Sequence, residues 1–129
     1  MLGRNAYEPH ELAHARAVVK KQLADWRSAG ADGDLEATYF NVLVLALDRP
    51  FVHRIRKMTG KDTNPLSEVE MLVESLLDND GVLREIKVIR YDPDKSVLGL
   101  QIGDRIALTA DDFEELSAAF LKDVEQKSA

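Results

Sequence analysis

The segment from Asp34 to Leu47 constrains the fold of this 129-residue chain more than any other. It carries Phe40 and the unbroken apolar run 42–47, so that apolar side chains cover nearly every side of a helix. A helix that is apolar all round lies at the centre of a domain. We therefore expect this segment to form the central helix, with Asn41 as a hydrogen-bonded amide inside the core.

Two further segments in the first half of the chain show helical signals. Residues 9–29 repeat apolar side chains every three or four positions, begin with Pro9 and are followed by Gly30. Proline is favoured in the first turn of a helix and glycine just beyond the last, so an amphipathic helix is predicted there. A short helix is also expected over residues 51–58, because Pro50 breaks the preceding helix.

Two helices in the second half of the chain have favourable N-terminal residues. Asn64 is a good N-cap for a helix over residues 65–78. Thr109 and Asp112 are spaced as in a capping box, which predicts that a last helix starts after Thr109. The buried stripe of this last helix is expected to consist of Phe113, Leu116, Phe120 and Val124.

Between these two helices, apolar residues alternate with polar ones, which is the period of a β-strand. Strands are expected over residues 86–91, 98–102 and 105–108, with a hairpin turn at Gly103. The chain is thus predicted to be a single α+β domain over residues 1–129, with about four helices, a three-stranded antiparallel β-meander and a C-terminal helix. Because such a meander has two open edges, we also expect a homodimer.

The charge of the chain narrows the classes of partner. It carries 17 basic and 23 acidic side chains, a net charge of -6, which disfavours nucleic acid and anionic membranes. A winged-helix DNA-binding interpretation fails for the same reason, because residues 65–80 contain five acidic and no basic side chains. The absence of cysteine excludes disulfides and thiolate sites. Residues 1–9 have no apolar signal segment and the run 42–47 is too short to cross a membrane, so a cytoplasmic protein with no membrane partner is expected.

Residues 10–14 read His-Glu-x-x-His, the pattern of zinc-dependent hydrolases. In that pattern His10 and His14 bind zinc from one helix face, and Glu11 activates the metal-bound water. Helical spacing, however, places both histidines opposite the apolar stripe, on a side that faces water, and nothing marks a third ligand. A zinc hydrolase is therefore the alternative function, and a solvated helix face is the simpler interpretation. Apart from this zinc, no cofactor is expected.

Basic side chains gather after the central helix. The candidate binding residues are His53, Arg54, Arg56, Lys57 and Lys61. Such a cluster can bind a small anionic ligand or an acidic protein surface, or it can be paired with acidic neighbours as an ordinary solvated face. We expect a non-enzymatic protein-interaction or small-ligand-binding domain, with these residues as its binding surface.

Two stretches that cover most of the chain after residue 39 carry a further signal. They contain Phe40-Asn41-Val42, Arg49-Pro50-Phe51-Val52-His53-Arg54, Gly60-Lys61-Asp62, Asn64-Pro65-Leu66, Ser96-Val97-Leu98, Gly103-Asp104 and Phe113. Together they resemble a family of small uncharacterised bacterial proteins. The resemblance implies a bacterial protein but no activity, cofactor or catalytic residue, because the family has none assigned. It draws attention to the central helix, the basic segment and the meander, and away from His10 and His14.

Overall fold

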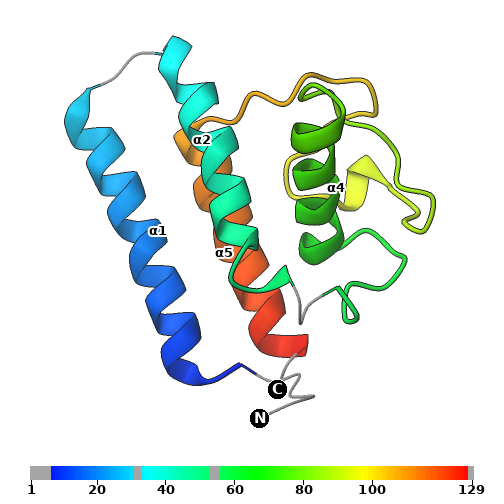
Figure 1. The fold of residues 1–129 in the computed structure, drawn as a ribbon, viewed down its shortest axis with the longest axis horizontal. Coiled ribbons are helices and arrows are strands. Elements are labelled where there is room, and N and C mark those ends of the chain that lie inside the picture. The colour runs from blue at the N-terminus through cyan, green and yellow to red at the C-terminus, as the bar shows by residue number, and fades with distance from the viewer. Residues whose placement is uncertain (1–6, 31–32, 53–55, 128–129) are drawn as a thin grey trace.

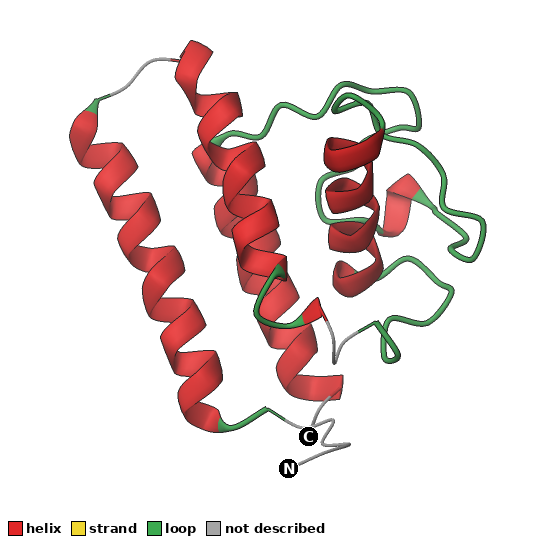
Figure 2. Ribbon diagram, in the orientation of Figure 1, coloured by secondary structure: helices red, strands yellow, loops and turns green. Residues whose placement is uncertain are grey.

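The computed structural model describes residues 7–30, 33–52 and 56–127. These residues form four α-helices and one short 3₁₀ turn: α1 (Pro9–Ala29), α2 (Gly33–Asp48), α4 (Pro65–Asp78), η1 (Pro93–Lys95) and α5 (Ala110–Lys127). Helix α1 lies against α5, α2 packs on α5, and α4 packs on both α2 and α5 (Figure 1). Helix α5 is therefore the element that the other helices share, and a long segment of loops leads from α4 back to it (Figure 2).

Helix α2 supplies the middle of the core from one side. Phe40 is fully buried, and the centroid of its ring lies 5.3 Å from that of Trp26 and 5.4 Å from that of Phe113. This confirms that the segment contributes to the centre of the core. However, Leu35 and Val42 on α2 are 59% and 56% exposed. The expectation of a helix buried on every side is therefore wrong, because one apolar face of α2 meets solvent.

The predicted boundaries of α1, α4 and α5 are confirmed. The residue after α1 is Gly30, whose φ of 63° is the left-handed conformation that favours glycine. The Asn64 side chain accepts a hydrogen bond from the N–H of Ser67 at 2.9 Å, and the Ser67 hydroxyl accepts one from the N–H of Asn64 at 2.9 Å. Thr109 and Asp112 form the same reciprocal pair, at 3.0 and 3.1 Å. These bonds satisfy N–H groups that the first turn of a helix leaves without partners.

The predicted α+β fold is wrong. Within the described part of the chain, the only β-type pairings are two isolated bridges, Asp62 with Arg90 and Val82 with Arg105, and no sheet forms. The segments that were expected to be strands are loops beside α4 (Figure 2). Without a meander, the open edges that suggested a homodimer are absent from these residues.

A short helix was also expected over residues 51–58. Residues 53–55 of this segment lie outside the described residues, and residues 56–58 form a turn.

Side chains of the helices replace the missing β-ladder as partners of the loop backbone. The carboxylate of Glu68 on α4 accepts hydrogen bonds from the N–H groups of Val97 and Leu98, at 2.7 and 3.0 Å. Asn41 on α2 donates to the carbonyl of Ile106 at 2.8 Å and accepts from the N–H of Leu108 at 3.2 Å. Asn41 is thereby confirmed as a hydrogen-bonded core amide. Because a buried backbone group needs a partner but not a particular kind of partner, these bonds hold the chain in loops where a neighbouring strand would hold a sheet.

The alternating apolar residues complete the helical core instead of forming one face of a sheet. Ile89, Ile106 and Leu108 are buried against the helices, whereas Val88 and Ile102 are exposed. Alternation shows only that an extended chain has one buried side. A loop that lies on a helical layer satisfies this pattern as well as a strand does.

Candidate functional site

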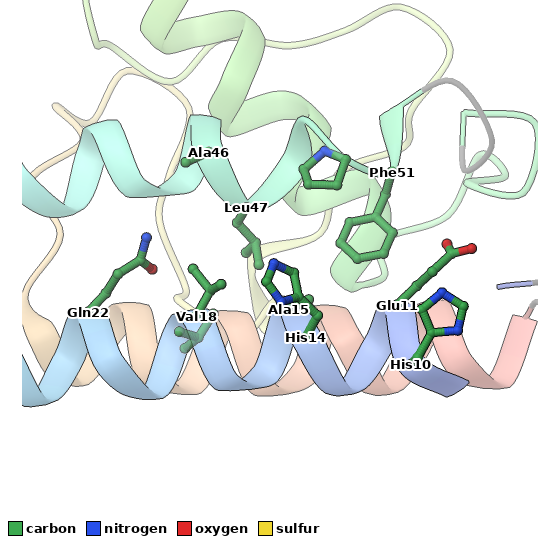
Figure 3. A pocket seen from close by; sticks show the side chains of 11 residues that line it. His10, Glu11, His14, Ala15, Val18, Gln22, Ala46, Leu47 and Phe51 are labelled. Atoms are coloured by element: carbon green, nitrogen blue, oxygen red, sulfur yellow. The ribbon is translucent and has the colours of Figure 1, made fainter. Parts of the chain in front are cut away.

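An apolar groove runs between α1 and the C-terminal part of α2, and its volume is about 430 Å³. From α1 it is lined by His10, Glu11, His14, Ala15, Val18, Val19 and Gln22. The remaining lining residues are Ala46 and Leu47 of α2, with Pro50 and Phe51 just after it. Figure 3 shows side chains of α1 rising toward α2 across this space. The groove is therefore built from two helix faces and from the chain that follows α2.

The groove exists because α1 is attached to α5 and only loosely to α2. Arg16 pairs with Glu125 at 3.3 Å, and Arg27 pairs with both Asp111 and Glu114 at 3.0 Å. Exposed ion pairs of this kind contribute little stability, but these connect the first half of α1 to the end of α5, and the end of α1 to the start of α5. Helix α1 thus packs against α5, and the neighbouring face of α1 stays open toward α2.

An aromatic contact closes each of the two ends of the gap between α1 and α2. Near the connection between these helices, Trp26 stacks on Tyr39 with ring centroids 5.1 Å apart. Near the start of α1, the hydroxyl of Tyr7 donates a hydrogen bond to the carbonyl of Phe51 at 2.9 Å, and the two rings meet edge-on. Between these contacts, the alanines of the lining are too short to span the gap. A continuous apolar space is left.

The two histidines of the zinc pattern, His10 and His14, lie at the rim of this groove. Both are exposed, as helical spacing predicted, but they also line the groove, which the pattern alone did not indicate (Figure 3). Among the residues that the structure describes, no group of three histidine, aspartate or glutamate side chains could hold a metal ion. The zinc-hydrolase alternative stays a prediction, and it requires a third ligand from outside the described residues.

One residue of the groove wall, Val18, is a weak signal of the groove in the sequence. Val18 is apolar but lies outside the buried stripe of α1, and it is 39% exposed at the wall of the groove. Leu47 and Phe51 form the opposite wall although both are buried. A single apolar residue beside a stripe does not reveal what faces it, because scattered exposed apolar residues are common on protein surfaces.

Arg56, one of the predicted anion-binding residues, has an internal role. Its guanidinium donates two hydrogen bonds to the buried carboxylate of Asp48, at 3.1 and 2.9 Å, and its Nε lies 3.7 Å from Glu70. Burial raises the pKa of Glu70, and the positive charge of Arg56 opposes that shift. Arg56 therefore links the end of α2 to α4. Its positive charge is largely balanced by the carboxylates of Asp48 and Glu70.

The other predicted binding residues are divided between described and undescribed parts of the chain. His53 and Arg54 lie outside the described residues, whereas Lys57 and Lys61 are exposed. The structure therefore does not bring the five residues together as one described site. An anion-binding surface over this segment stays a prediction.

Replacing Arg56 with alanine is expected to lower the free energy of unfolding by about 1–3 kcal/mol, because Asp48 would stay buried without its bidentate partner. Lys57→Ala is the control next to it in sequence, and as an exposed substitution it is expected to change stability by no more than about 0.5 kcal/mol. Urea denaturation measures both effects. Equal stabilities of the two variants would show that the Arg56–Asp48 pair contributes little in solution.

The structure defines a helical domain with an apolar groove between two of its helices. No family model, curated protein or solved structure matches the chain. The suggested bacterial family therefore stays a prediction. Within the described residues, none of the helices combines the length and the apolar character needed to cross a membrane.

Proposed function

We propose that the chain is a binding domain that takes a small, elongated apolar molecule into the groove between α1 and α2. The main support is a continuous apolar space of about 430 Å³ between these helices. Small-molecule sites typically have volumes of roughly 300–1,000 Å³, are mostly apolar and often lie between helices. They also carry a few polar groups that orient the ligand, and this groove has such groups at its rim.

The dimensions of the groove favour a slender ligand over a helix of another protein. The α1 wall extends from His10 to Gln22, which corresponds to about 18 Å at the helical rise per residue. A helix is about 10 Å wide, and the Trp26–Tyr39 stack and the Tyr7–Phe51 contact close the two ends of the gap, so a helix could enter only if α1 moved away from α2. A partner helix could place side chains into the groove but would itself lie outside it. A narrow molecule fits inside along its length.

The polar groups are placed to hold a ligand that has one polar end. His10 and His14 lie on the rim toward the start of α1, and Gln22 lies at the other end of the α1 wall. Imidazole and amide groups can both donate and accept hydrogen bonds, so either end can orient a polar head group. Val18 and Phe51, between them, provide apolar surface for the body of the ligand.

Filling the groove is expected to prevent binding. Ala15→Trp and Ala17→Trp form a matched pair, because both residues lie on α1 but only Ala15 lines the groove. The apolar fluorescent probe 1-anilinonaphthalene-8-sulfonate is expected to bind the unchanged protein and the Ala17 variant with similar affinity, and the Ala15 variant at least about tenfold more weakly. Fluorescence titration measures the three affinities, and thermal unfolding verifies that all three proteins are folded.

Equal probe binding by the two tryptophan variants would contradict a site in the groove, and so would a failure of the unchanged protein to bind the probe. Competition with decanol and with decanoate then tests the shape of the ligand. Both linear molecules are expected to displace the probe, because each can lie along the groove. If neither does, the site does not accept an elongated apolar chain.

A further inference from the structure

One face of α2 is apolar, uncharged and open to solvent. Leu35 and Val42 are 59% and 56% exposed, and at helical spacing Leu35, Val42 and Ala46 lie within about 40° of one another. Between Glu36 and Asp48 the helix carries no acidic or basic side chain. Helices α4 and α5 pack on other faces of α2, and Figure 1 shows α2 on the near side of α5. Large apolar side chains aligned on an uncharged helix face indicate a contact surface.

Charges of opposite sign flank the two ends of this face. Asp34 lies in the first turn of α2, and Arg49 follows its last residue. Both side chains are exposed. Within the described part of the chain, neither forms a hydrogen bond or an ion pair. Their separation in sequence corresponds to about 22 Å along the helix. The face is thus an apolar strip with a negative end and a positive end.

We infer that this face of α2 is the contact surface between two copies of the chain, packed antiparallel about a two-fold axis. An antiparallel arrangement places Asp34 of each copy opposite Arg49 of the other, whereas a parallel arrangement opposes like charges. The point midway between residues 34 and 49 lies beside Val42, so the axis passes next to Val42 and the two Val42 side chains meet. A two-fold interface requires a surface that is complementary to itself, and this strip satisfies that requirement.

The charge pattern favours a second copy over an unrelated apolar partner, because Asp34 and Arg49 are matched to each other across the antiparallel axis. The strip is small compared with the roughly 800 Å² that each partner buries in a standard interface. Side chains that flank it on α2, such as Thr38 and Leu45, must therefore contribute, and a dissociation constant in the micromolar range is expected. Ala46, at one edge of this strip, also lines the α1–α2 groove, but the contact does not require a ligand there.

A single introduced cysteine reports this contact directly, because the chain contains no cysteine of its own. Mild oxidation of Val42→Cys is expected to give a disulfide-linked dimer as the main product, since side chains beside the axis approach the Cβ separation of about 3.5–4.5 Å that a disulfide requires. Val88→Cys is the matched control, because Val88 is 60% exposed but lies in the loops after α4. Non-reducing electrophoresis compares the two variants. Equal amounts of crosslinked dimer would overturn the inference.

Charge reversal tests the direction of packing. Asp34→Lys and Arg49→Glu are each expected to weaken self-association of the full chain at least about fivefold in analytical ultracentrifugation, and the double variant is expected to restore it. Effects on folding would instead accumulate in the double variant, and thermal unfolding measures them separately. A monomer at concentrations up to about 100 µM, or a double variant that associates no better than the single variants, would overturn the inference.

The groove variant Ala15→Trp is expected to leave self-association unchanged. Failure of the groove site and failure of this contact therefore appear in different measurements.

Discussion

Replacing Phe40 with alanine is expected to lower the free energy of unfolding by about 3–5 kcal/mol, the usual cost of truncating a fully buried phenylalanine. Phe40 has no exposed surface. Its ring contacts those of Trp26 on α1, Tyr39 on α2 and Phe113 on α5, with centroids 5.3, 5.0 and 5.4 Å away. The cavity would open where three helices meet, so movement of one helix cannot close it without disturbing its contacts with the others.

Chemical denaturation followed by circular dichroism measures the loss. Leu77→Ala is a suitable control, because Leu77 lies on α4 and is 64% exposed. Its replacement is expected to change the free energy of unfolding by no more than about 0.5 kcal/mol. Similar losses in the two variants would contradict a core that is centred on Phe40.

Replacing Glu68 with alanine is expected to lower the free energy of unfolding by about 2–4 kcal/mol. The buried carboxylate accepts hydrogen bonds from the N–H groups of Val97 and Leu98 at 2.7 and 3.0 Å. Alanine leaves both groups without this acceptor, and an unpaired buried N–H costs about 1–3 kcal/mol. Removal of a desolvated charge offsets part of this loss. Denaturation gives the total, and faster amide hydrogen exchange at Val97 and Leu98 is expected to locate it.

The pH dependence of stability provides a second test of Glu68. Burial raises the pKa of Glu68, and the two backbone hydrogen bonds oppose the shift. A carboxyl group whose pKa is raised by folding contributes stability that is fully present below its ordinary value of 4.5 and is lost as the pH rises through the folded-state value. Glu68→Gln carries no titrating group at this position. The unchanged protein is therefore expected to lose stability relative to this variant as the pH rises above 4.5, and a constant difference would contradict it.

The helix boundaries could be predicted because the interactions that set them are local. The bonds between Asn64 and Ser67, and between Thr109 and Asp112, each join residues three positions apart. Gly30 likewise ends α1 through its own backbone conformation. Such interactions are visible in a few consecutive letters of sequence.

The meander could not be distinguished from loops in the same way. The residues that satisfy the backbone around Ile106 and Leu98 are Asn41 and Glu68, which are distant in sequence. Alternating apolar residues show which side of an extended segment is buried, but they do not show whether its hydrogen-bond partners are another strand or the side chains of a helix. The three predicted strands failed for this reason.

For the candidate site, the sequence alone predicted the helix that carries His10 and His14, and it predicted the apolar character of α2. Only the tertiary structure decided that α1 rests on α5, so that a groove opens toward α2, and that Leu35 and Val42 face solvent. The physical reason is the range of the interactions. Helix formation and capping depend on neighbours within a turn or two, whereas the position of one helix against another depends on contacts between residues far apart in the chain, such as Arg16 with Glu125 and Phe40 with Phe113.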